Sequence, residues 1–456
     1  MYVVDDVLDD QLRRIEQRES VVGIIGLGYV GLPLAVAFAE AGLHVIGFDI
    51  DTGRVADLNA GICAIKDVDA EQLRALVAAG HFRATTDFSE LATVDAVSIC
   101  VPTPVLDDKA PDISFVLSAA EQVKTYLRPG QLVSLESTTY PGTTDELVVP
   151  LLEESGLVAG KDFYLVFSPE RIDPGNPKYG LKNTPKIVGG VTPKCATFAS
   201  ALYGAVTEQV VVVSTTKAAE LVKLLENTFR AVNIGLANEF AQIANVLGAN
   251  IWEVVDAAAT KPFGFMPFYP GPGVGGHCIP VDPHYLLWKM EKLGFPSPLI
   301  EVGMKVNEDM PYFVVEQVAR ALETQNKDLE GASVAVLGVA YKKDIPDVRE
   351  SPALEVLALL RERGARITYI DAYVPSLRLG PETYTATEYS SEALGAADCV
   401  VIITDHSHIN YADVARDARL VVDTRNATRD VEGADHVWRL VRPSHTAAHT
   451  LARVGQ

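Results

Sequence analysis

Cys278 lies in a loop whose composition suits nucleophilic chemistry. Residues 273–282 read GVGGHCIPVD and follow PGP, so glycines and prolines crowd the residues before the cysteine. Backbone N–H groups in such a loop can hold an oxyanion or a pyrophosphate, and a thiolate is a strong nucleophile. A free cysteine is more often a small buried side chain, and a reactive one needs a cation nearby. The loop alone leaves both interpretations open.

A polar stripe on a predicted helix offers that cation. Within TTKAAELVKLLENTFRAVNIGLANEFAQIANVLG, Lys223 and Asn227 are one turn apart and Glu220 precedes them, so the three share one face. An ammonium and an amide can stabilise a thiolate and a developing oxyanion. The same spacing describes an ordinary solvated stripe, and spacing does not decide between the two. Asp282 is close enough in sequence to share the cysteine's site, whereas His277 is expected to point away from its neighbour.

Gly26, Gly28 and Gly31 form a GxGxxG motif in a context typical of dinucleotide binding. An expected strand precedes it, an expected apolar helix follows, and Asp49 ends the next expected strand about 20 residues on. The first glycine permits a tight turn, the second lets the backbone approach a pyrophosphate, and the third lets helix and strand pack closely. Asp49 is expected to bind the ribose hydroxyls, which favours NAD over NADP, although the nearby Arg54 weakens that preference.

The elements that must position these residues alternate in a regular way. Strands and helices alternate to about residue 207, long helices follow, and the alternation returns near residue 332, which predicts an α/β protein with two Rossmann-like doubly wound parallel-sheet domains joined by a helical central domain. The expected divisions are an N-terminal extension (1–20), a dinucleotide-binding domain (21–207), a helical domain (208–325), a second Rossmann-like domain (326–440) and a tail (441–456).

Composition narrows the function further. The formal net charge is −21, which excludes non-specific attraction to nucleic acid or anionic lipid. The five cysteines are widely spaced and form no CxxC pair, so neither a disulfide framework nor a metal site is expected. No basic, apolar leader begins the chain and no apolar run is long enough to span a membrane, so a cytoplasmic protein is expected.

Six motifs together identify a resemblance. GIIGLGYVGLPLAVAFAEAG, ESTTYPGTT, FSPERIDPGN, AAELVKLLENTFRAVN, GPGVGGHCIPVDP and VLGVAYKKDIPDVRESPA occur in the order and spacing found in bacterial UDP-sugar 6-dehydrogenases. The resemblance covers residues from about 21 to about 430. It implies NAD as cofactor, a nucleoside-diphosphate sugar as substrate and a homodimer built on the long helices.

The resemblance also assigns roles to individual residues. It implies that Cys278 is the nucleophile. The other residues implied to be catalytic are Lys223, Asn227, Asp282, Glu170 and Thr138. The implied cofactor-binding residues are Gly26, Gly28, Tyr29, Val30, Gly31, Asp49, Arg54, Thr103, Thr138 and Arg349. The implied substrate-binding residues are Glu170, Lys223, Asn227, Tyr269, Gly275, Tyr341 and Lys342.

Two segments depart from the family pattern. Some relatives carry an arginine just before the glycine loop that reaches a neighbouring subunit's sugar site, whereas this chain has KPFGFMPFYPGPG there. The second Rossmann-like domain opens with GVAYKKD in place of GxGxxG, so that domain is expected to bind the nucleotide sugar and no second dinucleotide.

The expected reaction is a four-electron oxidation. The C6 hydroxyl of UDP-glucose or UDP-N-acetylglucosamine, with TDP-glucose as the next candidate, becomes a carboxylate through a cysteine thiohemiacetal and a thioester. Two alternatives stay open: a two-electron dehydrogenase of the hydroxyacid or 6-phosphogluconate type, and a nucleotide-sugar sensor without catalysis. The number of NADH molecules formed per product separates the three.

Overall fold

A computed structural model describes residues 6–65, 68–106, 108–173, 176 and 178–440, and its contacts divide the chain into two compact units. Unit 1 comprises residues up to 226 together with 284–294, and unit 2 comprises residues 227–283 and those from 295 onward. The predicted tail (441–456) lies outside the described residues. The expected α/β class, with two parallel-sheet domains and a helical region, is confirmed. The domain boundaries stay a prediction.

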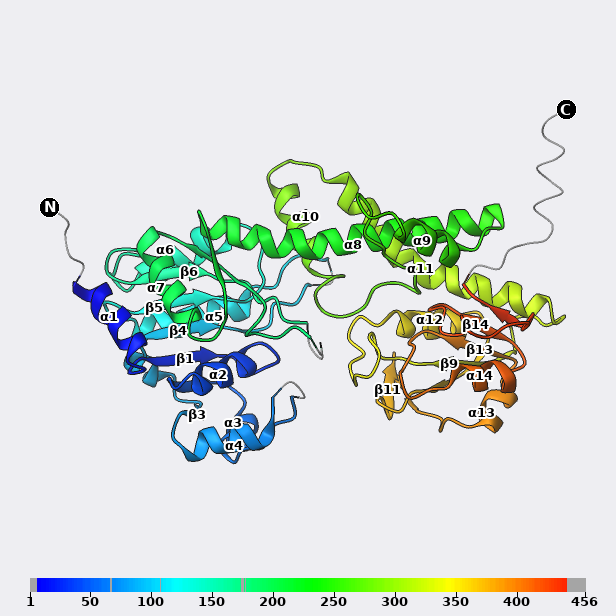
Figure 1. Cartoon of the computed structure of the whole chain (residues 1–456), viewed down its shortest axis with the longest axis horizontal. Helices are drawn as coiled ribbons and strands as arrows, with labels where there is room; N and C mark the ends of the chain where they lie inside the picture. Colours follow the sequence, from blue (N-terminus) through cyan, green and yellow to red (C-terminus); the bar gives the residue numbers. More distant parts are fainter. Residues whose placement is uncertain (1–5, 66–67, 107, 174–175, 177, 441–456) are drawn as a thin grey trace. The chain divides into compact units, whose positions relative to one another are not determined.

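Unit 1 is built on an eight-stranded sheet of order β3-β2-β1-β4-β5-β6-β7-β8 (Figure 1). Its neighbouring strands are parallel except for β6 and β7, an antiparallel pair that the alternation pattern did not predict. The strands are β1 (Val21–Ile25), β2 (His44–Phe48), β3 (Phe82–Thr85), β4 (Ala96–Ile99), β5 (Leu132–Leu135), β6 (Tyr164–Phe167), β7 (Lys186–Gly190) and β8 (Val210–Val213).

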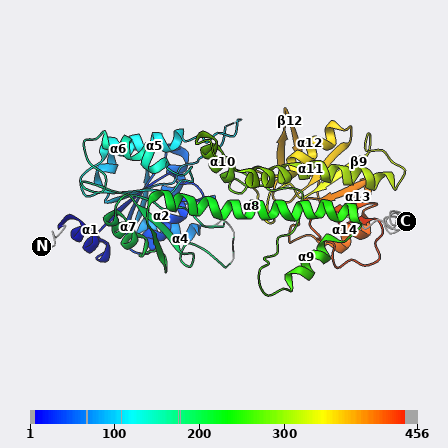
Figure 2. The same cartoon turned by 90° about the horizontal axis from the view of Figure 1, so that it is seen from above.

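Helices cover both faces of this sheet. One apolar core lies under the helices α2 and α7, and a second lies under α5 and α6 on the opposite face (Figure 2). The helices of this unit are α1 (Asp6–Glu16), α2 (Gly31–Glu40), α3 (Thr52–Asn59), α4 (Ala70–Ala78), α5 (Ser114–Tyr126), α6 (Val149–Glu153) and α7 (Pro193–Tyr203). A 3₁₀ helix (Phe88–Thr93) and a π-helical turn (Thr144–Val148) interrupt the connections.

The N-terminal extension is part of unit 1. Helix α1 packs against α7, and its Leu8 and Ile15 are buried in the core that α2 and α7 share. Arg14 of α1 forms an ion pair of 2.8 Å with Asp95, a buried carboxylate that also binds Arg128 at 2.7 Å. The extension therefore contributes both apolar contacts and charge to the unit.

Unit 2 contains a five-stranded parallel sheet of order β10-β9-β13-β14-β15. Helices α11 (Pro298–Glu323) and α12 cover one face, and α13 and α14 cover the other. The elements of its Rossmann-like part are β9 (Ser333–Leu337), α12 (Pro352–Glu362), β10 (Arg366–Ile370), the hairpin β11 (Ser376–Leu379) and β12 (Glu382–Thr385), α13 (Ser391–Ala396), β13 (Cys399–Ile402), α14 (Tyr411–Asp417), β14 (Val421–Asp423) and β15 (Val437–Trp438).

Four further helices make up the helical region of the chain. They are α8 (Thr216–Leu247), α9 (Ile251–Ala259), α10 (Asp282–Lys292) and α11 (Pro298–Glu323). Helix α8 has 32 residues. Figure 2 shows it as one continuous helix. Among the residues that the structure describes, no helix combines the length and the apolar character that a bilayer span needs.

Candidate active site

The glycine motif forms the loop between β1 and α2. Gly26 adopts φ +90°, and its N–H donates to the carbonyl of Phe48 at 2.8 Å. A Cβ added to Gly28 would meet none of the described atoms within 4 Å, so the backbone is open to a ligand there. A Cβ on Gly31 would lie 1.9 Å from the carbonyl oxygen of Gly26. Any side chain would clash there, so only glycine fits. These geometries fit the roles expected of the three glycines.

Asp49 lies directly after β2, beside this loop. Its Oδ2 accepts the N–H of Leu27 and a guanidinium N–H of Arg54, both at 2.9 Å, and its Oδ1 accepts the N–H of Asp51 at 3.0 Å. Burial alone would raise the pKa of Asp49, but these N–H donors and the charge of Arg54 hold it below its ordinary value. An ionised carboxylate at this position can accept hydrogen bonds from the ribose hydroxyls of a dinucleotide.

Other residues expected at the cofactor lie in unit 1 around the same sheet edge. Val30 is the residue that precedes α2, and it makes no side-chain hydrogen bond to the helix N-terminus. Tyr29 is half exposed. Thr103 follows β4, and its carbonyl accepts the hydroxyl of Tyr285. Among the described residues no side chain caps the N-terminus of α2, which fits a phosphate site there.

Glu170 is buried in unit 1, and its two oxygens have different partners. Oε1 accepts the N–H groups of Arg171 and Ile172 at 2.6 and 2.7 Å, whereas Oε2 lies 3.3 Å from Nζ of Lys186. Burial alone would raise the pKa of Glu170, but Lys186, the two N–H groups and the half-buried Lys223 together lower it. Glu170 is therefore an ionised carboxylate in a fixed orientation.

Two neighbouring threonines after β5 differ in their surroundings. Thr138, which the resemblance assigns to the site, is half-buried. The adjacent Thr139 is buried, and its hydroxyl has no hydrogen-bond partner within the described ranges. A buried hydroxyl without a partner is rare in proteins and often marks a place where water or a ligand binds. Sequence reasoning missed Thr139, because its burial and lack of a partner are visible only in the fold.

Cys278 is half-buried, while Cys100, Cys195 and Cys399 are buried. Its Sγ lies 3.4 Å from Nδ1 of His277, so the expectation that these adjacent side chains point apart is wrong in this loop. The half-exposed thiol fits a reactive cysteine better than an inert one of the core.

An amide and a carboxylate form a buried pair just beyond the cysteine. Nδ2 of Asn227 on α8 donates to Oδ2 of Asp282 at 2.5 Å, and the N–H of Asp282 donates to the carbonyl of Cys278 at 2.8 Å. Asp282 begins α10, so the cysteine loop ends in a helix start that the pair holds in place. The interpretation of the polar face as a solvated stripe is wrong for Asn227, which is buried.

Glu220 on the same face has a structural role. It is almost fully buried, and it accepts the N–H groups of Gly142 and Thr144 and the hydroxyl of Thr144. Burial raises the pKa of Glu220. This residue therefore fixes the segment that follows β5.

The cysteine loop packs against the GVAYKKD segment within unit 2. A Cβ on Gly275 would lie 2.6 Å from Cβ of Tyr341, and a Cβ on Gly276 would lie 2.9 Å from its ring. The N–H of Gly276 also donates to the carbonyl of Arg349 at 3.0 Å. Glycines are thus needed because the two loops touch, and residues 341–349 lie directly over the loop of Cys278.

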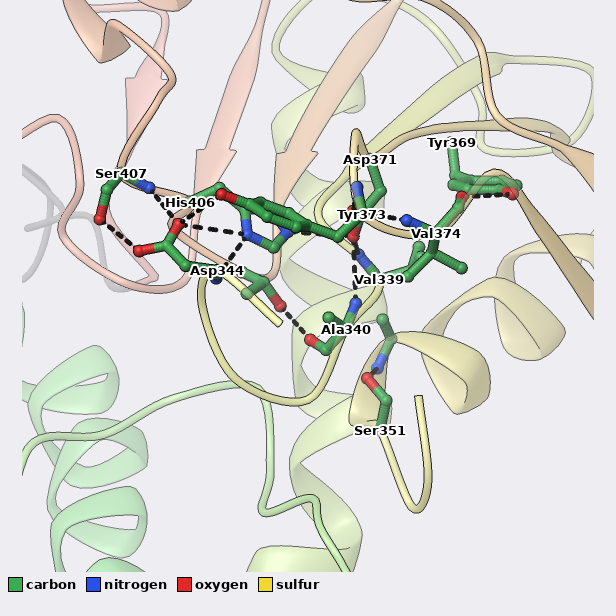
Figure 3. Close-up of polar contacts among 12 residues, drawn as sticks. Val339, Ala340, Asp344, Ser351, Tyr369, Asp371, Tyr373, Val374, His406 and Ser407 are labelled. Atoms are coloured by element: carbon green, nitrogen blue, oxygen red, sulfur yellow. Dashed lines mark hydrogen bonds and ion pairs between the residues drawn. The ribbon is translucent and has the colours of Figure 1, made fainter. Parts of the chain in front are cut away.

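A polar network holds the base of residues 339–344 (Figure 3). Asp371, directly after β10, accepts the N–H groups of Val339 and Ala340 at 2.8 and 3.2 Å. The buried His406 donates from Nε2 to Asp371 at 3.0 Å and accepts the N–H of Asp344 at Nδ1, also at 3.0 Å. With its two nitrogens used in this way, His406 is the neutral tautomer that carries its proton on Nε2.

The side chains on this segment differ in exposure. Lys342 is half-buried, and Arg349 is exposed and bound by Asp347 at 2.6 Å. Tyr269 lies elsewhere in unit 2: it stacks on Trp252 and donates to Asp256 at 2.8 Å. Among the described residues, Tyr269 makes no hydrogen bond or ring contact with the cysteine loop. The expected site residues therefore fall into two groups, one in each unit.

Comparison with known proteins identifies the family of the chain. Three domain models of the UDP-glucose/GDP-mannose dehydrogenase family match the chain: the NAD-binding domain at residues 20–207, the central domain at 217–309 and the UDP-binding domain at 335–430. The UDP-N-acetyl-D-glucosamine 6-dehydrogenase of Pseudomonas aeruginosa is 37% identical over 392 residues, which cover 86% of this chain and 91% of the relative.

Solved structures give the same result. UDP-N-acetyl-D-mannosamine dehydrogenase from Pyrococcus horikoshii superimposes with a TM-score of 0.85 at 34% identity, covering 93% of this chain and 99% of the other. A UDP-glucose dehydrogenase from Pyrobaculum islandicum superimposes with a TM-score of 0.81 at 30% identity, covering 93% and 98%. The expected resemblance and the expected use of NAD are confirmed: the chain belongs to the UDP-glucose/GDP-mannose dehydrogenase family and is an NAD-dependent nucleotide-sugar dehydrogenase.

Proposed function

We propose that the chain oxidises the C6 hydroxyl of a UDP-linked hexose to a carboxylate, with Cys278 as the nucleophile. One CH₂OH group, one water and two NAD⁺ give one carboxylate, two NADH and three protons. The observation that carries the proposal is the half-exposed thiol beside the buried Asn227–Asp282 pair, under the loop of Tyr341 and Arg349.

The residues of the chain divide the work between them. The thiolate of Cys278 adds to the C6 aldehyde and holds the carbon as a thiohemiacetal, which a second oxidation turns into a thioester. Asn227, Lys223 and the N–H groups of the glycine loop stabilise the oxyanions of both stages. Glu170 accepts a proton from the hydrolytic water, and Thr138 helps to place that water. The unpartnered hydroxyl of Thr139 is a second candidate for placing it.

NAD, when bound, supplies the hydride acceptor. The open backbone at Gly28, the close packing at Gly31 and the carboxylate of Asp49 fit this group. The N-terminus of α2 binds the pyrophosphate and Asp49 binds the ribose, with Arg54 shifting away from the carboxylate.

We infer that the sugar is an N-acetylated hexosamine. Several similar proteins are named for N-acetyl-D-glucosamine, N-acetyl-D-mannosamine or N-acetyl-D-galactosaminuronic acid. A site that accepts the acetamido group is roomy and loses only modest affinity for the smaller glucose, so discrimination is asymmetric. NADH absorbance with UDP-glucose, TDP-glucose and the UDP-linked N-acetylated gluco, manno and galacto sugars tests this. Turnover of UDP-glucose alone would overturn it.

The nucleophile is tested by Cys278→Ser, with Cys63→Ser as the matched control because Cys63 is also half-buried. The serine hydroxyl ionises far less readily than a thiol, so uronate formation should be lost while NAD binding persists. Wild type and the control should form two NADH per uronate. A ratio of one would favour a two-electron dehydrogenase, no NADH at all would favour a sensor, and undiminished uronate formation by Cys278→Ser would refute the role of the thiol.

We also propose a homodimer built on α8. Apolar side chains of this helix are exposed at helical spacing; they are Leu221, Leu225, Phe229, Leu236, Phe240, Ile243, Val246 and Leu247. An apolar stripe of this extent is typical of a protein interface. A monomeric mass at micromolar concentration would contradict the proposal.

A further inference from the structure

A buried ion cluster lies behind Glu170 in unit 1. Lys186 is the first residue of β7, and its Nζ lies 2.6 Å from Oε2 of Glu136 and 3.3 Å from Oε2 of Glu170. All three residues are buried. One ammonium thus serves two carboxylates, and the cluster carries a net negative charge.

The two carboxylates differ in what else binds them. Oε1 of Glu136 accepts the hydroxyl of Tyr203 at 2.6 Å, and this hydroxyl also lies 2.7 Å from that of Ser134. Glu136 is therefore fixed deep in the sheet. Glu170 receives only backbone N–H groups at Oε1, so among its described contacts Lys186 is the side-chain partner of Oε2.

The charges in this cluster support one another. Burial alone would lower the pKa of Lys186, but Glu136 and Glu170 raise it well above its ordinary value. The charge of Lys186 is in turn the largest influence that lowers the pKa of Glu170. A buried carboxylate without such a partner takes up a proton instead of remaining charged.

We propose that Lys186 is a positioning residue for thioester hydrolysis, which keeps Glu170 ionised and oriented to receive a proton from the attacking water. In that step the water oxygen bonds to the thioester carbon, the water proton moves to Glu170, and the carbon–sulfur bond breaks to release Cys278 as a thiolate. This inference rests on the proposed function. Glu136 tunes the step, because it competes with Glu170 for the single ammonium.

The test compares variants with opposite expected effects. Lys186→Met removes the charge, and Lys186→Arg keeps it. Glu136→Gln removes the competing carboxylate and leaves Lys186 to Glu170 alone. Because Lys186→Met leaves two buried carboxylates unpaired and can unfold the chain, the double variant with Glu136→Gln is made alongside it. Rapid mixing records the NADH burst and the steady-state rate with the sugar that wild type turns over.

In the variants without Lys186, the NADH burst should persist while the steady-state rate falls about 100-fold, the scale of one general base. An acyl adduct should accumulate on Cys278, and hydroxylamine, which attacks a thioester without a base, should restore turnover. The acidic limb of the pH profile should move to higher pH without Lys186 and to lower pH in Glu136→Gln, while Lys186→Arg should resemble wild type.

Two outcomes would overturn the inference while the proposed function stands. One is an equal fall of burst and steady-state rate, which would indicate a purely structural role. The other is a pH limb that moves in the same direction, or not at all, in Glu136→Gln and in the variants without Lys186. Failure of wild type to form NADH with any sugar would instead refute the proposed function itself.

Discussion

The two parallel sheets of the chain begin alike. In each, a glycine follows the first strand with positive φ, +90° at Gly26 and +81° at Gly338, and its N–H donates to the last residue of the second strand. In each, the aspartate after the second strand, Asp49 or Asp371, accepts an N–H from the residue that follows the glycine, at 2.9 and 2.8 Å. The turn and aspartate with which a dinucleotide site begins therefore occur in both sheets.

The two sites differ in what occupies the space beside the aspartate. At the first, Gly28 is open and α2 begins at Gly31. At the second, His406 is buried against Asp371, and α12 begins only at Pro352. The two sites thus differ both in the side chain beside the aspartate and in where the next helix begins. The longer connection after Gly338 contains Tyr341 and Arg349, which contact the cysteine loop.

The largest effect is expected from a substitution that disrupts the glycine motif of the first sheet. Gly31→Ala places a methyl carbon 1.9 Å from a backbone oxygen, so the turn must move, at a cost of about 3 kcal/mol, and NAD binding should become undetectable. Gly28→Ala meets no described atom and should keep the wild-type melting temperature, yet bind NAD more weakly because its methyl meets the pyrophosphate. Calorimetry and NAD titration measure both. Equal melting temperatures for the two variants would contradict the assignment of their roles.

An intermediate effect sharpens the comparison of the two aspartates. Asp49→Ala should weaken NAD binding about 10-fold to 100-fold, because hydrogen bonds to a charged acceptor are lost. Asp371→Ala should leave NAD affinity unchanged but lower the free energy of unfolding by about 2 kcal/mol, because it leaves buried N–H groups of Val339 and His406 without an acceptor. Titration of each variant with NAD, next to its melting curve, provides the measurement. Loss of NAD affinity in Asp371→Ala would show that the second site also binds the cofactor.

The smallest expected effect concerns acid stability. Burial would raise the pKa of Asp371, but His406 and the backbone N–H groups of Val339 and Tyr373 hold it below its ordinary value. A carboxyl with a lowered folded pKa stabilises the fold above its unfolded pKa, about 3.9, and loses that contribution as pH falls through the folded value.

Asp371→Asn should therefore be less stable than wild type by about 1 kcal/mol near neutral pH, and the gap should narrow below about pH 4. Melting temperatures measured across that range test the sign. A gap that widens in acid would mean that the carboxyl is not held ionised in the fold.

Local pattern was sufficient for the first site, because the glycines, the strand before them and Asp49 are close in sequence. The glycines before Cys278 were interpreted as N–H donors for an anion, and the contact with Tyr341 that requires glycine at Gly275 and Gly276 could not be read from the sequence. Side-chain clusters whose members come from strands far apart in the chain could not be predicted from local sequence patterns.

The ion cluster around Lys186 and the pair of His406 with Asp371 each join residues that are far apart in the chain, so no spacing rule predicts them. The antiparallel pairing of β6 with β7 was not predicted for a related reason: the residues of a strand do not indicate its direction relative to its neighbour. Spacing left open whether the face of Glu220 is solvated, because the burial of Glu220 depends on its contact with the distant segment at Gly142.

Helix α1 has a consequence for where this chain can be cut. The family match begins at residue 20, after the helix has ended. A fragment trimmed to that match would lose Leu8 and Ile15 from a shared core and one of the two guanidinium partners of Asp95. We therefore expect a fragment that begins at residue 20 to be less stable than one that keeps α1.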